Sequence, residues 1–543
     1  MSTTKAHWGT ISISAAVLLV ALKPEYSLLN SYVWTAVALF SFFTLFRIVY
    51  AAVLYPKYFT PLKHLPTPPG RHWLKGNTDS IFLDFPADRA RRWMETVPNN
   101  GLIRYYTVGN LERVFVTSPN ALREVLVQRV YDFPKPDLAK IQLSRITGTG
   151  LLIAEGDEHK AQRKNLMPAF SYRHIKDLYP IFWSKGVEMV GMIENHIKGN
   201  SGKNVITVGD WASRATLDII GVAGMDQDFH SLRDPSNKLN EQYRRALKEP
   251  STLMKLVTLL GLFVVDLRLV LKLPLKRNIE IKAASDYIRT VARQIICQKK
   301  EKMEKQKDTN NDVDIISVAL RSGGFSEENL VDQMMTFLAA GHETTSSAFQ
   351  WAIYALCKHP EMQTRLREEI RANLPPISKE DPTPASASAV DALPYLNAFC
   401  NEVLRYYPPV RITVREAARD TTIVGAPIPK GTILLLAPQA INHSPQFWGR
   451  DADEFNPERW MGPGRANTGG ADSNYAFMTF IHGPRSCIGQ GFAKAELACL
   501  VAVTVGKFHV ELEDPDAPLE MKNGVTVSPR DGVRAKFTAL EGW

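Results

Sequence analysis

Cysteine is scarce in this sequence: its 543 residues contain only five, an odd number with irregular spacing. No C-x-x-C pair occurs, which excludes the zinc-ribbon and thioredoxin-like classes. A disulfide framework is also unexpected, because such frameworks are typical of small secreted domains with paired cysteines. We therefore predict that the folded part faces a reducing compartment, and that one of the five cysteines has special chemistry.

The sequence also lacks the marks of a nucleic-acid-binding protein. Its net charge is +9, but no dense basic stripe is interleaved with aromatic residues, and Lys299–Lys305 is interrupted by Glu and Met. We expect no nucleic-acid partner, and this basic excess instead fits an anionic membrane surface or an acidic redox partner. A hydrophobic fraction of 45% supplies ample core for a large globular domain.

The amino terminus carries two apolar runs. Residues 33–54 are long and apolar enough to cross a bilayer and are interpreted as a transmembrane helix, although Arg47 leaves a buried core helix as the alternative. The run over residues 11–22 is shorter. It is a candidate for an earlier membrane helix or for a signal-peptide core, but no convincing cleavage site precedes Lys23. Residues 1–60 are therefore predicted to form a membrane anchor.

A basic and proline-rich segment follows the anchor. Four basic residues place the rest of the chain in the cytosol under the positive-inside rule. They are Lys57, Lys63, Arg71 and Lys75. Repeated prolines predict a stiff, extended hinge over residues 61–75, because proline has a fixed φ and no amide hydrogen. Residues 76–543 contain no internal repeat or strong break, and we expect them to form one domain.

Helical periodicity dominates this domain, with short strand-like runs between the helices. Ile103–Val108 and Arg113–Thr117 are expected to pair as strands around a Gly-Asn turn. The longest helix is expected from about Ser326 to Cys357, with Ser326 as its N-cap. The predicted fold class is mainly α with small β-sheets.

The strongest motif is the run Phe480-Ile-His-Gly483-Pro-Arg485-Ser-Cys487-Ile-Gly489. Glycines on both sides of the cysteine let the backbone turn tightly and approach a flat ligand. An arginine two residues earlier and the start of a helix just after both favour thiolate over thiol. A lone cysteine is usually an inert small hydrophobe, so the prediction depends on the whole pattern.

This loop resembles the haem-binding loop of the cytochrome P450 family, and further matches in the expected order extend the resemblance over residues 60–540. The resemblance implies the cytochrome P450 fold and haem b as cofactor. Cys487 would be the proximal iron ligand, with Phe480, Gly483 and Gly489 around the cofactor. The anchor and proline segment are similar to those of the microsomal branch, and the chain most resembles fungal enzymes of secondary metabolism.

A second motif, the run AGHETT over residues 340–345, lies inside the long apolar helix. Acidic and hydroxyl groups are costly to bury there, and a mid-helix threonine can bond back to a carbonyl and open a groove. The resemblance implies that Glu343 and Thr344 are the acid–alcohol pair that passes protons to the oxygen site. The alternatives are a helix C-cap or a glycine that serves helix packing.

Two charged sets complete the resemblance. Glu402 and Arg405 share a helix face, and with Arg459 they would form a buried structural triad behind the cysteine loop, with an ordinary surface pair as the alternative. The second set would donate hydrogen bonds to the haem propionates. It consists of His159, Arg163, Arg415 and Arg485. His159 departs from the family, which commonly has tryptophan there, and its charge would depend on pH.

Together these features predict a haem-thiolate monooxygenase in the endoplasmic reticulum membrane, with its catalytic domain facing the cytosol. The resemblance implies NADPH–cytochrome P450 reductase as electron donor, with cytochrome b5 as a further candidate partner. Lys160, Lys164 and Lys494, on the cysteine side, are expected to meet the reductase. The substrate would be an apolar small molecule, with terpenoid, polyketide or alkaloid intermediates of fungal secondary metabolism as the leading class.

Substrate contacts are expected, by the same resemblance, from five mainly apolar segments. These are Asp137–Leu151, Leu253–Leu271, Phe337–Ala340, Pro409–Val414 and Gly524–Val527. Three rival interpretations stay open on the sequence alone: a haem-dependent isomerase or dehydratase, a non-catalytic haem protein of the membrane, and a helical protein without haem.

Overall fold

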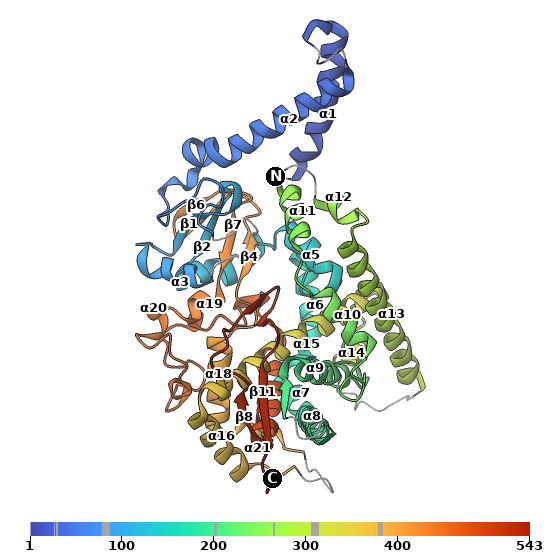
Figure 1. Ribbon diagram of the computed structural model, residues 1–543, viewed down its shortest axis with the longest axis vertical. Coiled ribbons are helices and arrows are strands. Elements are labelled where there is room, and N and C mark those ends of the chain that lie inside the picture. The colour runs from blue at the N-terminus through green and yellow to red at the C-terminus, as the bar shows by residue number, and fades with distance from the viewer. Residues whose placement is uncertain are drawn as a thin grey trace.

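The structure is a computed structural model that describes residues 2–26, 28, 31–78, 87–199, 204–263, 267–305, 314–377 and 384–543. Two helices project from one end of the molecule, and the rest divides into a β-rich part and a larger helical part (Figure 1). Within the segment Leu253–Leu271, residues 264–266 lie outside the described residues.

The described α-helices are, in chain order, α1 (Ser2–Leu22), α2 (Tyr32–Val49), α3 (Ala87–Thr96), α4 (Pro119–Arg123), α5 (Asp137–Thr147), α6 (Gly156–Leu166), α7 (Tyr172–Ile175), α8 (Tyr179–Gly199), α9 (Val208–Met225), α10 (Lys238–Ala246), α11 (Thr252–Phe263), α12 (Leu267–Lys272), α13 (Lys276–Lys305), α14 (Ile315–Arg321), α15 (Glu327–Lys358), α16 (Pro360–Asn373), α17 (Ala387–Asp391), α18 (Pro394–Tyr406), α19 (Pro438–Asn442), α20 (Pro445–Trp448) and α21 (Gln490–Lys507).

The described strands are β1 (Leu102–Tyr106), β2 (Glu112–Val116), β3 (Val205–Thr207), β4 (Thr413–Glu416), β5 (Thr421–Ile423), β6 (Ala426–Ile428), β7 (Ile433–Leu436), β8 (Phe508–Leu512), β9 (Met521–Asn523), β10 (Val527–Pro529) and β11 (Arg534–Ala539). The largest sheet has the order β1-β2-β7-β4, and a three-stranded sheet has the order β3-β11-β8. Strands β9 and β10, and β5 and β6, form two antiparallel pairs. The predicted class, mainly α with small sheets, is confirmed.

The projecting helices fit a membrane anchor. Helix α2 continues into a π-helical segment, and together they span Tyr32–Phe59, with a mean hydropathy of 2.1. Among the described residues this is the helix long and apolar enough to cross a membrane, whereas Ser12–Leu22 is apolar but shorter. The structure thus extends the span expected over residues 33–54 by a few residues at its carboxyl end.

The proline-rich hinge is packed against the β-rich part rather than extended throughout. Pro61–His64 forms a 3-10 turn, and the Leu62 amide donates to the Thr60 hydroxyl that caps it (3.1 Å). Leu62 and Leu65 are buried in the same core as β1, β2 and β7. The backbone amide of Arg104 also donates to the carbonyl of Pro66 (2.9 Å). Proline stiffness and these contacts together fix the segment on the domain surface.

Helix α15 is the central element of the helical part. It contacts α9, α5, α13 and α21, and most of its side chains are buried, as expected for a helix that is apolar nearly all round. Ser326 accepts a hydrogen bond from the amide of Asn329 (3.2 Å), so the predicted N-cap and the predicted long helix are confirmed. The predicted strand pair is confirmed too, with Ile103 opposite Phe115.

Candidate functional site

The cysteine loop is closed by its own backbone. The amide of Cys487 donates to the carbonyl of Phe480 (2.8 Å), and the amide of Ser486 donates to the carbonyl of Gly483 (3.0 Å). Gly489 is the N-cap residue of α21, so the cysteine lies just before a helix amino terminus, as the sequence predicted. The helix dipole at that end favours a nearby anion.

Two residues of the loop have left-handed backbone. Gly483 has φ +79°, and a Cβ atom built on it would lie 2.1 Å from the carbonyl oxygen of Leu126, so only glycine fits. Ile481 has φ +57°, which is strained for a β-branched residue. Gly489, by contrast, would meet only the Phe170 ring at 3.8 Å, so the protein itself leaves room for a side chain there.

The Cys487 thiol is accessible, yet burial raises its pKa, so it faces an internal space rather than bulk solvent. The backbone amide of Gly489 and the guanidinium of Arg163 act in the opposite direction and lower that pKa. Arg163 donates to the Ser486 carbonyl (2.7 Å) and hydroxyl (3.2 Å). Arg163 is therefore a cation beside the thiol, whereas the Arg485 guanidinium is directed to Glu155 and to the carbonyl of Ala154.

Arg485 belongs to a buried cluster of positive charge. It pairs with Glu155 and donates to the carbonyl of Ala154 (2.8 Å). Arg415 is 3% exposed and donates to the Val414 carbonyl (2.8 Å), and burial together with Arg485 lowers its pKa to about 10. Within the described part of the chain, the Nε atoms of both arginines are buried without a hydrogen-bond partner.

Lys135 joins this cluster and was missed by the sequence reasoning. Burial, and then the charges of Arg415 and Arg485, hold the pKa of Lys135 well below its ordinary value. The Lys135 backbone amide donates to the Glu155 carboxylate (2.9 Å), which places the residue beside the cluster. In the sequence, Lys135 lies between Pro134 and Pro136, and this run has no regular periodicity that would indicate a buried position.

His159 is 2% exposed and lies within the same cluster. Its Nδ1 is 3.1 Å from the Tyr131 hydroxyl. Burial and the positive charges of Arg485 and Arg163 lower its pKa to about 4, so the imidazole is neutral at neutral pH. A neutral imidazole still offers one N–H donor, and the expected pH-dependent charge appears only in acid.

These groups fit the haem that the sequence predicts. Several buried cations are balanced by the single carboxylate of Glu155 in the described cluster, and two guanidinium Nε donors there are without partners. Buried donors and buried excess charge both cost free energy unless an acceptor satisfies them. Two carboxylates, the number on the edge of haem b, would satisfy them. The accessible thiol of Cys487 lies near Arg163, which also lies near His159 of the cluster.

On helix α15, accessible surface interrupts an otherwise buried stretch. Ala340 is exposed and Thr344 is half-buried, although residues 331–339 are all buried. The Thr344 hydroxyl donates to the carbonyl of Ala340 (2.7 Å), which is the backward bond that the sequence suggested. Gly341 serves packing, because a Cβ there would lie 3.0 Å from Ile220 of α9.

Glu343 points toward the carboxyl-terminal hairpin. Its carboxylate accepts a hydrogen bond from the Thr526 hydroxyl (2.9 Å), and the Lys522 ammonium lies 4.0 Å away. The neighbouring His342 is turned into the core, where its Nε2 is 3.2 Å from the Ser213 hydroxyl. Glu343 and Thr344 are therefore adjacent, and each has a different partner.

The predicted charged triad is present and buried. Arg405 makes two hydrogen bonds to the Glu402 carboxylate (2.7 and 2.8 Å), and Arg459 makes one (3.1 Å). Trp460 Nε1, which was not assigned to the triad, donates to the same carboxylate (2.9 Å). Arg405 also donates to the carbonyl of Asn442 (2.7 Å), whose side chain bonds to residues 478 and 479 just before the cysteine loop.

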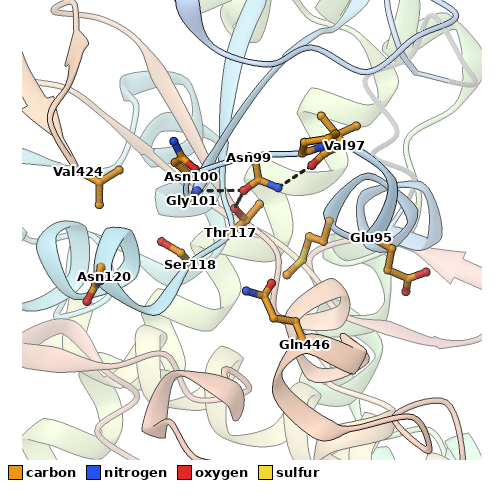
Figure 2. Close-up of a pocket in the computed structure, with 12 residues that line it drawn as sticks. Glu95, Val97, Asn99, Asn100, Gly101, Thr117, Ser118, Asn120, Val424 and Gln446 are labelled. Atoms are coloured by element: carbon orange, nitrogen blue, oxygen red, sulfur yellow. Dashed lines mark hydrogen bonds between the residues drawn. The ribbon is translucent and has the colours of Figure 1, made fainter.

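A surface cleft of about 500 Å³ has no part in this site (Figure 2). Its walls include Asn99, Gly101, Thr117 and Val424, and none of its lining residues belongs to α15, the cationic cluster or the cysteine loop. The Asn99 side chain accepts from Gly101 N (3.0 Å) and from the Thr117 hydroxyl (2.7 Å), so these polar groups satisfy one another. The cleft lies between the end of α3, the loop before β1, the start of α4, the turn between β5 and β6, and α20.

The fold and the arrangement of these groups are those of a haem-thiolate enzyme. The sequence profile of the cytochrome P450 family matches residues 66–537. The chain is 53% identical to cytochrome P450 monooxygenase sphH of Aspergillus fumigatus, with 99% of each chain covered. It is 43% identical to cytochrome P450 monooxygenase FSL4 of Gibberella zeae, with 91% of each covered. This protein belongs to the cytochrome P450 family and is a monooxygenase whose cofactor is haem b.

Replacing Arg405 by alanine should destabilise the folded protein by about 3–5 kcal/mol, because it strands the buried Glu402 carboxylate. Thermal unfolding and haem content measure the effect. Arg365→Ala is the matched control: it breaks an exposed pair with Glu458 and should cost about 1 kcal/mol or less. Equal losses in the two variants would contradict a buried structural role for the triad.

His159 should make the protein acid-sensitive. Its pKa is about 4 in the folded state against an ordinary value of 6.5. Its contribution to stability is therefore fully present above about pH 6.5 and is lost as the pH falls towards 4, since the unfolded chain takes up the proton first. His159→Trp should flatten the dependence of the unfolding temperature on pH between about pH 7.5 and pH 5. Parallel curves for parent and variant would refute this.

Proposed function

We propose that Cys487 provides the thiolate that binds the haem iron, and that this monooxygenase oxidises an apolar small molecule. The observation that carries the proposal is the accessible thiol set before the amino terminus of α21, with the Gly489 amide and Arg163 both favouring its ionised form. Haem b, when bound, supplies the chemistry that activates dioxygen, and a thiolate ligand favours cleavage of the O–O bond.

The cationic cluster would hold the two propionates. The unpartnered Nε atoms of Arg415 and Arg485 provide donors, and neutral His159 provides one more N–H. We add Lys135 to this set because its charge lies close to both arginines, and a nearby anion would stabilise all three. The backbone at Phe480, Gly483 and Gly489 would lie along the cofactor beside the cysteine.

Glu343 and Thr344 would guide protons on the opposite face of the cofactor. The exposed Ala340 and the half-buried Thr344 mark the accessible stretch of α15 that supports this assignment. The Thr344 hydroxyl would exchange its bond to the Ala340 carbonyl for one to the oxygen site, with the Glu343 carboxyl as the acid behind it. An isomerase or dehydratase would have no use for this pair.

The surface beside the cysteine loop would dock a flavoprotein, NADPH–cytochrome P450 reductase, or cytochrome b5. Lys160 and Lys164 on α6, and Arg173 on α7, are exposed there. Lys494 is not suited to docking: it is half-buried beside the Phe477 ring (5.5 Å), and burial lowers its pKa to about 8. We therefore leave Lys494 out of the proposed docking surface.

Residues 1–60 would anchor the domain 76–543 in the endoplasmic reticulum membrane through the hinge 61–75, with the domain in the cytosol. Helices α11 and α12 lie at the same end of the molecule as α1 and α2 (Figure 1). They carry exposed apolar side chains that suit a lipid surface. These are Leu253, Leu256 and Leu269. A membrane-dissolved, apolar intermediate of fungal secondary metabolism, such as a terpenoid, polyketide or alkaloid, fits this arrangement.

The ligand assignment is tested by the absorption spectrum of the reduced protein with carbon monoxide. The parent should show a red-shifted, thiolate-type band, and Cys487→Ala should lose both this band and turnover. The control Cys297→Ala removes an exposed cysteine elsewhere and should change neither. Persistence of the band in Cys487→Ala would overturn the proposal. Product formed without matching oxygen consumption would instead indicate a haem-dependent isomerase or dehydratase.

The docking surface predicts a salt-sensitive electron transfer rate. The double charge reversal Lys160→Glu/Lys164→Glu should slow reduction by the reductase about tenfold at low ionic strength. At high salt the rates of the parent and the variant should converge, because salt screens the charges. The control Lys282→Glu/Lys305→Glu makes the same charge change on exposed positions of α13 and should have little effect. Equal rates for the two double variants, measured by stopped-flow absorption, would discard this surface.

A further inference from the structure

The hairpin of β9 and β10 is fastened to helix α15. The Ser347 hydroxyl (2.8 Å) and the Trp351 indole N–H (2.9 Å), one helical turn apart, both donate to the carbonyl of Val527. On its other side, the amide of Val527 donates to the carbonyl of Pro409 (2.9 Å). The hairpin therefore bridges α15 and the segment that leads into β4.

The same hairpin provides the partners of Glu343. Thr526, which is 7% exposed, donates its hydroxyl to the Glu343 carboxylate (2.9 Å), and Lys522 on the paired strand lies 4.0 Å from it. The turn between the strands is exposed, with Val525 56% accessible. Thr526 lies between this exposed turn and Val527, whose carbonyl is held by α15.

In this structure each member of the acid–alcohol pair has its own hydrogen-bond partner. The Glu343 carboxylate bonds to Thr526, and the Thr344 hydroxyl bonds to the carbonyl of Ala340. Proton transfer requires donor and acceptor within hydrogen-bond reach, directly or through one water. The orientation of the Glu343 carboxylate is thus set by a group outside α15.

We propose that Thr526, assisted by Lys522, is a positioning residue that aims the Glu343 carboxylate, and that the β9–β10 hairpin thereby controls proton delivery. This inference rests on the role proposed for Glu343. A substrate that seats against the hairpin changes the position of Thr526 and so couples its own binding to the supply of protons. The hairpin would then act on coupling efficiency as well as on substrate fit.

The two outcomes of a turnover differ in the fate of the O–O bond. Hydroxylation takes two electrons from NADPH, through the reductase, and two protons; it breaks the O–O bond and places one oxygen in the product and one in water. Premature release takes the same electrons and protons but keeps the O–O bond and yields hydrogen peroxide. Which oxygen atom receives the second proton decides between them, so a misaimed carboxylate favours peroxide.

The test uses the full-length holoenzyme with its reductase and, as the probe, dodecanoic acid, an amphiphile with a long apolar chain. Thr526→Val keeps the side-chain shape and removes the donor. It should raise the peroxide released per NADPH oxidised by about three- to tenfold, the ratio that corresponds to the typical net free energy of one hydrogen bond. It should also raise the solvent deuterium isotope effect on NADPH oxidation. Thr526→Ser retains a hydroxyl and should restore both values.

Two further variants separate this inference from the proposed function. Ser528→Ala removes a neighbouring hydroxyl of the same hairpin, opposite Lys522 in the strand pairing, and should behave like the parent. In a Glu343→Gln background, Thr526→Val should add nothing, because the two changes act on one contact. The carbon monoxide spectrum checks that each variant binds haem equally.

If Thr526→Val released no more peroxide per NADPH than the parent while Glu343→Gln released more, only this inference would be overturned, and the role of Glu343 would stand. If Glu343→Gln released no more peroxide per NADPH than the parent, the proton-delivery role of Glu343 would be overturned, and the inference with it. Peroxide release from Ser528→Ala as high as from Thr526→Val would also overturn it, since hairpin disturbance rather than the Thr526 hydroxyl would then be responsible.

Discussion

Five hydrogen bonds converge on the buried carboxylate of Glu402, and the position of the cysteine loop depends on them. Arg405 provides two, and Arg459, Trp460 and the Asn456 amide provide one each. A buried carboxylate must be matched in charge and in hydrogen bonds, so this arrangement is stable only when all its donors are present. Through Asn442, the same network holds the chain just before residue 480.

The site itself combines opposite electrostatic demands. Burial disfavours the Cys487 anion, whereas the helix terminus, the Gly489 amide and Arg163 favour it. A short distance along the loop, Arg485 and Arg415 crowd against each other with buried donors left unsatisfied. Both demands would be met by one ligand with a metal centre and two carboxylates, as proposed for haem b. The protein alone is less well balanced than the protein with haem b.

Much of this was predictable because the relevant signals are local in the sequence. The spacing around Cys487, the apolar run of α15 with its Ser326 cap, and the i, i+3 pair of Glu402 and Arg405 are each contained in a short window, and each lies where expected. The contribution of Lys135 was not predictable, because its neighbours Arg415 and Arg485 are distant in sequence. The same holds for the place of Arg163, rather than Arg485, beside the thiol.

The sequence by itself determined the family, the cofactor class, the helical architecture and the long apolar helix near the amino terminus, because backbone periodicity and compact motifs are encoded by neighbouring residues. Only the tertiary structure decided which cation lies near the thiol, that Lys494 is half-buried, and that Thr526 bonds to Glu343 from 183 positions away. Charge, burial and hydrogen bonding depend on distances in space, and those distances exist only once separate elements have packed together.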